Sequence, residues 1–218
     1  MRSSHREARH HPTDPAARLV VAGCATAAGL ADPPLAQLAR WRDTPRDTIA
    51  AEPVVAPCPA ANPACPRLHA LRAEACLGEA LAARAPRAAC PPSRTAPLLD
   101  CASEAYAAAL AANAPSAPTL RAGLAQALLC RAELDDPARA TTRATAAAEA
   151  AAGAAPPELA ALHGARAALL LARLGPAPGR CAEARRALDL SAAAPAEHRG
   201  RIGADALLHL RTCEAPPR

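Results

Sequence analysis

The chain contains no lysine and no phenylalanine, and Trp41 and Tyr106 are its only aromatic residues. All-β sandwiches and barrels cover their pleated faces with aromatic and β-branched side chains, so this scarcity argues against such a fold. Nucleic-acid modules that stack bases on aromatic rings are disfavoured for the same reason. The sequence also lacks a Cys-x-x-Cys pair, a Gly-rich phosphate loop, and the Gly-x-Ser-x-Gly and His-Glu-x-x-His motifs. It therefore predicts no catalytic residue, no metal site and no cofactor.

Alanine and arginine dominate what is present. Of the 218 residues, 67 are alanine and 24 are proline, and all 25 basic residues are arginine. The formal net charge is +5, but the arginines are scattered among acidic residues, so no basic tail or stripe is visible. We interpret most of the arginines as solvated surface, with a polyanion-binding face as the alternative.

Residues 1–31 have the pattern of an export signal. Several arginines precede an uncharged stretch at 19–31 that ends in small residues, and this stretch is too short to span a membrane as a helix. Two processing routes are open. The sequence Val-Ala-Gly-Cys at 21–24 resembles the lipobox of bacterial lipoproteins, in which Cys24 would be acylated; alternatively, cleavage follows Ala31. The remaining alternative is an apolar helix start in a cytosolic protein.

The cysteine count supports the export hypothesis. Nine cysteines are present, and eight remain once Cys24 is lipidated or removed. An even number of cysteines in an exported chain predicts a disulfide framework. Its members are Cys58, Cys65, Cys76, Cys90, Cys101, Cys130, Cys181 and Cys213.

The remainder divides into a Pro-rich linker or arm at 32–66 and a helical domain at 67–218. In the arm, a short helix is possible near 35–42. From residue 67 onward, Ala, Leu, Arg and Glu favour helix, and Pro and Gly mark the ends of segments. We interpret Asp136 before Pro137 as a helix N-cap. Helices are predicted at 67–86, 96–113, 118–134, 137–153, 157–174, 179–193 and 196–213.

Prolines recur at a fixed spacing in this domain. A shift of 39 residues superimposes three prolines on three others, and a period of 20–50 residues is typical of stacked repeats. The pairs are Pro118 with Pro157, Pro137 with Pro176, and Pro156 with Pro195.

One segment resembles the second helix of a tetratricopeptide repeat. Ala102, Tyr106, Ala109 and Leu110, followed by Pro115, match its small–aromatic–small packing face, although the period of 39 exceeds that family's usual length of about 34. The resemblance implies an all-α fold of antiparallel helix-turn-helix repeats. We expect an α-solenoid of about three helix pairs plus a capping helix at 196–213, following the Pro-rich arm.

The predicted layout suggests disulfide partners. Neighbouring antiparallel helices bring together residues that are equidistant from the connecting turn. This rule pairs Cys101 with Cys130 and Cys181 with Cys213. Cys76 and Cys90 then flank the first helical hairpin, and Cys58 and Cys65 close a loop in the arm.

From the resemblance we expect a non-catalytic protein–protein interaction scaffold or adaptor of the bacterial cell envelope. Its concave face would hold a protein or peptide partner, and contact with the membrane would be limited to an N-terminal lipid anchor. An acidic segment or a C-terminal carboxylate would suit a guanidinium-lined groove. The alternatives are a thiol-redox or metal-handling exported protein and a cytosolic Arg-rich polyanion binder. The candidate groove residues are Arg121, Gln126, Arg166 and Arg173.

Overall fold

The computed structural model describes residues 32–86, 88–175 and 177–214, and this part of the chain contains helices and no strand. The predicted all-α class is therefore confirmed. Each of the seven predicted helices has a counterpart whose ends differ by at most four residues. These helices are α4 (Ala64–Ala82), α5 (Ala96–Ala111), α6 (Ala117–Ala132), α7 (Pro137–Ala152), α8 (Pro157–Leu174), α9 (Ala177–Ser191) and α10 (Ala196–Glu214). The predicted export signal at 1–31, including Cys24, lies outside the described residues.

Proline and capping side chains determine where the helices begin. Prolines occupy the first turn of α5, α6, α7 and α8, where the missing N–H has no intrahelical acceptor in any case. The Asp136 carboxylate accepts hydrogen bonds from the backbone N–H groups of Ala138 and Arg139, each at 3.1 Å. Asp136 is thus the N-cap of α7, as the sequence predicts.

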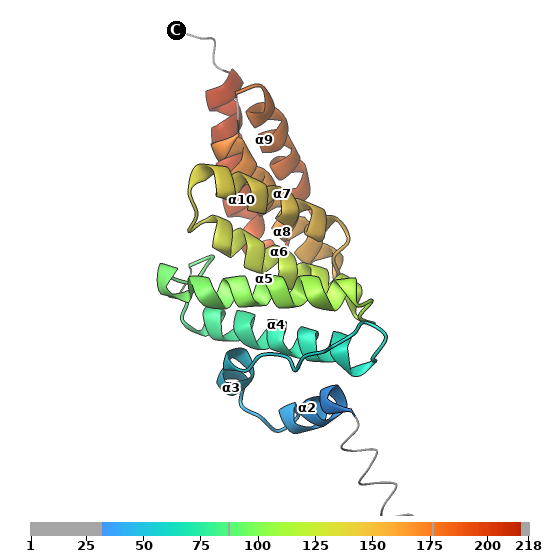
Figure 1. The fold of residues 1–218 in the computed structure, drawn as a ribbon. Coiled ribbons are helices and arrows are strands. Elements are labelled where there is room, and N and C mark those ends of the chain that lie inside the picture. Colours follow the sequence, from blue (N-terminus) through green and yellow to red (C-terminus); the bar gives the residue numbers. More distant parts are fainter. Residues whose placement is uncertain (1–31, 87, 176, 215–218) are drawn as a thin grey trace, which may run out of the picture.

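The helices pack in sequence order and form an elongated stack, with α2 (Pro33–Trp41) at one end and α10 at the other (Figure 1). Each long helix contacts the next, and α4, α6, α8 and α10 also contact one another in succession. No comparable contact joins α5, α7 and α9 among the described helices. The even-numbered helices therefore form the tighter, inner layer of an α-solenoid, and the odd-numbered helices form the outer layer.

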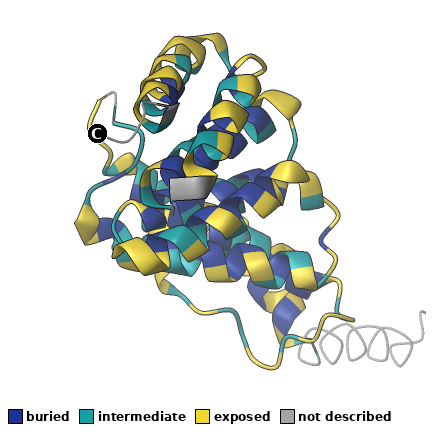
Figure 2. Cartoon of the chain, turned by 90° about the horizontal axis from the view of Figure 1, so that it is seen from above, coloured by how far each residue is buried: buried dark blue, intermediate teal, exposed yellow. Residues whose placement is uncertain are grey.

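Alanine supplies most of the core. The buried positions of α7 are all alanine, namely Ala140, Ala144, Ala147, Ala148, Ala150 and Ala151. Figure 2 shows the buried residues where helices face one another and the exposed residues on the outer surfaces of the helices. Because an alanine buries little area, each such contact contributes less transfer free energy than a leucine contact would.

The Pro-rich segment is more structured than the sequence predicts. Besides α2, near the short helix expected there, it contains α3 (Arg46–Ala51), and both helices pack against α4. Trp41, 2 % exposed, and Ile49 belong to the same buried cluster as Leu68 of α4. The prolines conceal these helices because Pro33 and Pro45 stand at helix starts, where proline is tolerated.

Glu52 fastens this segment together. Its carboxylate accepts hydrogen bonds from Arg40 (Nη1, 3.0 Å), the Trp41 indole N–H (2.9 Å) and the Gln37 amide (3.2 Å). The bond from Arg40, followed by that from Trp41, lowers the pKa of Glu52 to about 2. The charged form of Glu52 thus holds α2 against the chain that follows α3.

All eight candidate cysteines are in disulfides: Cys58–Cys65, Cys76–Cys101, Cys90–Cys130 and Cys181–Cys213. The first and the last are the pairs that we expected. The expected pairs Cys76–Cys90 and Cys101–Cys130 are wrong, because Cys76 is joined to Cys101 and Cys90 to Cys130.

The connection between α4 and α5 explains the exchange. It spans residues 83–95, so its centre is near residue 89, and Cys76 and Cys101 are almost equidistant from it. Cys90 lies within this connection rather than on a helix. Because α6 runs in the same direction as α4, its C-terminal end, which carries Cys130, comes to lie beside the connection.

No helix in the described ranges combines the length and apolar character that crossing a bilayer requires.

Candidate functional site

The inner layer presents one face of each of three helices to a common groove. On α8, Arg166, Leu170 and Arg173 are spaced by four and three residues, which places them on one side of the helix. Gln126 and Glu133, seven residues apart, do the same for α6. On α10 the corresponding positions are His198, Arg201, Asp205 and Leu208.

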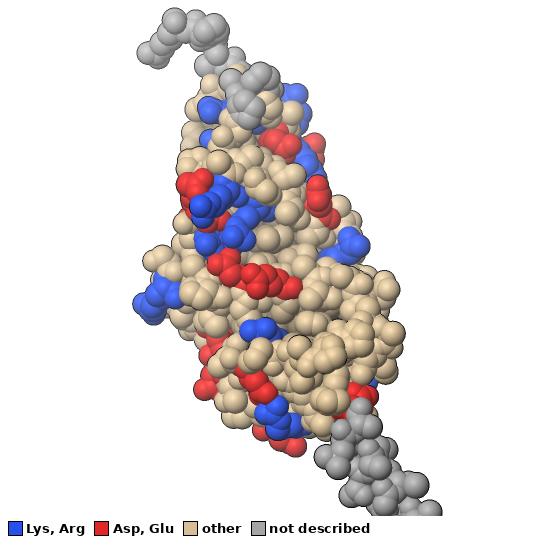
Figure 3. All heavy atoms as spheres, in the orientation of Figure 1, with Lys and Arg blue, Asp and Glu red and all other residues tan. Residues whose placement is uncertain are grey.

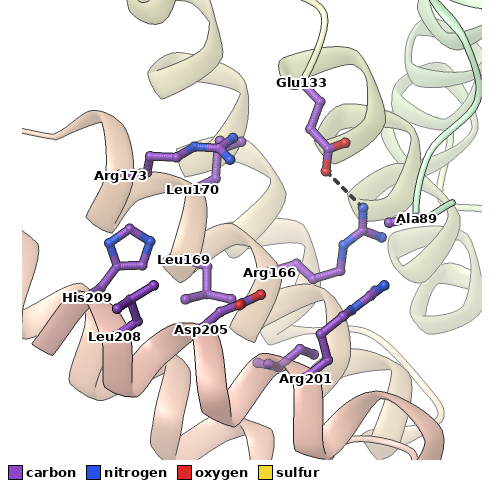
Figure 4. Close-up of a pocket in the computed structure, with 11 residues that line it drawn as sticks. Ala89, Glu133, Arg166, Leu169, Leu170, Arg173, Arg201, Asp205, Leu208 and His209 are labelled. Carbon is purple, nitrogen blue, oxygen red and sulfur yellow. Dashed lines mark hydrogen bonds and ion pairs between the residues drawn. The ribbon is translucent and has the colours of Figure 1, made fainter.

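The first part of this groove, which we call the Arg173 pocket, has a volume of about 410 Å³. Figure 4 shows its side chains extending from α8 and α10, with Glu133 reaching toward Arg166 from beyond the end of α6. Its lining combines charged and aliphatic groups: Ala89, Glu133, Arg166, Leu169, Leu170, Arg173, Arg201, Ile202, Asp205, Leu208 and His209.

The second part, which we call the His163 pocket, has a volume of about 420 Å³. Its lining residues are Arg84, Ala88, Ala89, Gln126, Leu162, His163, Arg166, Glu197, His198 and Arg201. Ala89, Arg166 and Arg201 line both pockets. The two pockets therefore adjoin, and together they form one inner groove along α6, α8 and α10.

Arg166 stands at the junction of the two pockets. Its side chain is only 14 % exposed, and its Nη2 donates to Glu133 Oε1 at 3.2 Å and to Cys90 Sγ at 2.9 Å. Burial lowers the pKa of Arg166, the nearby Glu133 carboxylate raises it, and the charges of Arg201 and Arg84 lower it further. An arginine nevertheless stays protonated in proteins, so Arg166 is a largely buried cation in the groove wall.

His163 is buried in the floor of the groove and is 4 % exposed. Its Nδ1 has no hydrogen-bond partner among the described residues. Burial, then the charges of Arg166 and His198, lower the pKa of His163 to about 4. The imidazole is consequently neutral at pH 7, with a ring nitrogen free to donate or accept one hydrogen bond.

Three of the four predicted groove residues lie together. Gln126 and Arg166 line the His163 pocket, and Arg173 lines the pocket named after it. Arg121 borders neither pocket; its Nη1 lies 2.8 Å from where a Cβ at Gly153 would stand. Arg121 and Gln126 are five residues apart, which separates them by about 140° around α6.

The sequence reasoning missed Arg84 and Arg201. Arg201 could have been found, because its spacing from Asp205 and Leu208 repeats the pattern of Arg166, Leu170 and Arg173. Arg84 had no comparable sequence pattern, since it lies in the connection after α4 and reaches the groove only through the fold.

Both carboxylates of the neighbouring Asp135 and Asp136 have structural partners, since Asp136 caps α7. Asp135 is paired with Arg131 and with Arg143 Nε (2.6 Å), and Asp100 accepts from Arg131 Nε at 2.9 Å. This network joins α5, α6 and α7. Within the described ranges, no group of three or more His, Cys, Asp or Glu is placed to hold a metal ion.

Charges of both signs are interspersed over the face shown in Figure 3, and on that face no extended area of one sign appears. No family model matches the chain, and neither the curated proteins nor the solved structures contain a match. The groove is therefore interpreted from its own geometry and chemistry.

Proposed function

We propose that this protein is a non-catalytic interaction scaffold of the bacterial cell envelope, which holds an extended segment of a partner protein in the inner groove. The observation that supports this proposal most is the continuity of the groove over three helices. Two adjoining pockets of about 410 and 420 Å³ share Arg166 and Arg201, which suits an elongated ligand better than a compact one.

The chemistry of the groove favours an acidic segment with aliphatic side chains. Arg166, Arg173 and Arg201 supply guanidinium groups that bind carboxylates in a bidentate manner. Beside them, the half-buried Leu169 and Leu208, which is 61 % exposed, offer apolar surface. A partner would thus gain both charge-assisted hydrogen bonds and the burial of apolar area.

The four disulfides are typical of a protein from an oxidising compartment. Export through the 1–31 segment accounts for them, and lipidation at Cys24 would anchor the protein. The intact mass of the native protein tests this proposal: cleavage before Cys24 with added acyl chains, or cleavage after Ala31, supports export. An unprocessed, fully reduced chain would favour the cytosolic polyanion binder instead.

The groove is tested by site-specific photo-crosslinking in the native host. We expect a crosslinker at Arg173 or Leu208 to capture one partner protein, and a crosslinker at Arg139 to fail. Arg139 is a matched control because it is 74 % exposed and lies on α7 of the outer layer. Capture of the same bands from all three positions would contradict a specific groove. A captured partner should be lost with Arg173→Ala/Arg201→Ala and retained with Arg121→Ala.

One contact favours thiol–disulfide exchange as a second candidate function. Cys90 Sγ accepts a hydrogen bond from Arg166 at 2.9 Å, and a neighbouring cation stabilises a thiolate leaving group. In such an exchange a partner dithiol would be oxidised while Cys90–Cys130 is reduced. Mild dithiothreitol treatment followed by thiol labelling tests this function: selective labelling of Cys90 and Cys130 supports it, and simultaneous labelling of all eight cysteines opposes it.

A further inference from the structure

The His163 pocket brings arginines from three different elements to one opening. Arg84 comes from the connection after α4, Arg166 from α8 and Arg201 from α10. Figure 4 shows the side chains of Arg166 and Arg201 extending toward the same side, where Ala89 lies. The three residues are far apart in the sequence, so their convergence results from the stacking of the helices.

The arginines that line the groove outnumber its carboxylates. In the described part of the chain neither the Arg84 nor the Arg201 side chain makes a hydrogen bond or an ion pair, whereas the Arg166 side chain is paired with Glu133. Glu197 is the other carboxylate that lines the pocket or pairs with its arginines. Asp205, which lines the adjoining pocket together with Arg166 and Arg201, is a third carboxylate. Over both pockets, four guanidinium groups, including that of Arg173, face three carboxylates, which leaves one positive charge in excess. The repulsion between Arg166, Arg84 and Arg201 would be relieved by a bound anion.

His163 provides a second, independent observation at the same place. Its ring is 4 % exposed, it lines the pocket, and its Nδ1 has no partner among the described residues. A buried polar atom without a partner costs free energy. Because Nδ1 is itself shielded from the pocket, a ligand would gain a hydrogen bond to it only after the ring turns. Arg166, Arg201 and His163 therefore combine charge with an unsatisfied buried group.

We propose that the His163 pocket binds a phosphate group through Arg84, Arg166 and Arg201. A tetrahedral oxoanion presents oxygens in several directions and can pair with guanidinium groups from three elements, whereas a planar carboxylate is satisfied by one guanidinium fork. The pocket, at about 420 Å³, is larger than one phosphate ion, and Leu162 and Ala88 border the remaining space. A small phosphomonoester would therefore fit as well as inorganic phosphate.

Isothermal titration of the oxidised protein at constant ionic strength tests this proposal. We expect saturable binding of inorganic phosphate or of glycerol phosphate, and much weaker binding of acetate. Arg84→Ala and Arg201→Ala should each weaken the binding by about tenfold, because each removes one charge-assisted hydrogen bond. Both side chains are exposed and unpaired in the described structure, so these variants should fold. Arg121→Ala, outside the groove, should bind like the wild type.

The titration separates the two sources of phosphate. If glycerol phosphate binds more tightly than inorganic phosphate, the remaining space of the pocket holds an organic group. If the two affinities are equal, the pocket recognises the phosphate group alone. Either result supports the site. The absence of saturable binding, equal affinity for acetate, or unchanged affinity in both pocket variants would overturn it. The titration uses the purified protein without a partner, so its failure is distinguishable from a failure of the crosslinking, although Arg166 and Arg201 line both pockets.

Discussion

Gly123 and Tyr106 show how much one residue contributes to the contact between two helices. Tyr106 of α5 is 4 % exposed, and its hydroxyl lies 2.5 Å from where a Cβ at Gly123 of α6 would stand. Burial, followed by the charge of Glu74, raises the pKa of Tyr106. The only tyrosine of the chain is thus accommodated by the absence of a side chain on the neighbouring helix.

We therefore expect Gly123→Ala to destabilise the protein by about 1–3 kcal/mol, because the methyl group displaces the Tyr106 ring in a packed core. Gly200→Ala is the matched control, since Gly200 also lies within a helix and a Cβ there meets nothing within 4 Å. It should stabilise the protein by about 0.5–1 kcal/mol through helix propensity. Urea unfolding measures both; a neutral Gly123→Ala would show that the ring moves freely.

Glu52 gives a prediction for the acid range. The pKa of Glu52 is lowered from 4.5 to about 2 in the folded protein, so the folded state favours the charged form. Its contribution to stability is fully present above pH 4.5 and is lost as the pH falls toward 2. Glu52→Gln should therefore have a lower melting temperature than the wild type at pH 6, and the two should converge near pH 2. A difference that stays constant with pH would contradict this role.

At the scale of single elements, the disulfides differ in the length of chain that they close. Cys90–Cys130 spans 40 residues, and Cys58–Cys65 spans 7. In the chain-entropy model, removing the first should cost about 4 kcal/mol and removing the second about 2 kcal/mol. Urea unfolding of Cys90→Ala/Cys130→Ala and of Cys58→Ala/Cys65→Ala measures these costs. Equal costs would show that the chain-entropy model does not describe this protein.

The helices could be predicted more fully than the contacts between them. Proline, glycine and the Asp136 cap mark helix ends locally, so the ends of α8 follow from the sequence alone. The disulfide partners of Cys76 and of Cys90 could not be predicted, because they depend on the length and path of the connection between α4 and α5. The groove could be predicted only in part. Helical periodicity identifies the side of α8 that faces the groove, whereas the position of Arg84 depends on how the connection after α4 folds.

On the scale of the whole molecule, the disulfides are unevenly distributed along the stack. Cys76–Cys101 joins α4 to α5, Cys90–Cys130 joins the connection between α4 and α5 to α6, and Cys181–Cys213 joins α9 to α10. None of the four disulfides involves α7 or α8. These two helices are retained by packing, largely of alanine, and by ion pairs such as Arg143 with Asp135 for α7 and Arg166 with Glu133 for α8.

We expect hydrogen–deuterium exchange to be faster in α7 than in α4 and α5. All of its buried side chains are alanine, so local opening there exposes little apolar area and costs less free energy than opening of α4 or α5. Mass spectrometry of peptides from α4, α5, α7 and α9 gives the comparison. Protection in α7 equal to that in α5 would contradict this expectation. Reduction of the disulfides should diminish the contrast.

Because no disulfide involves α7 or α8, the stack should bend most easily at these two helices. One cross-linked block contains α4, α5 and α6 with the connection between α4 and α5, and another contains α9 and α10. Arg84 belongs to the first block and Arg201 to the second. A small bend between the blocks therefore changes the separation of these two guanidinium groups without breaking a covalent bond. The width of the groove should therefore change more easily than the arrangement of the helices within each cross-linked block.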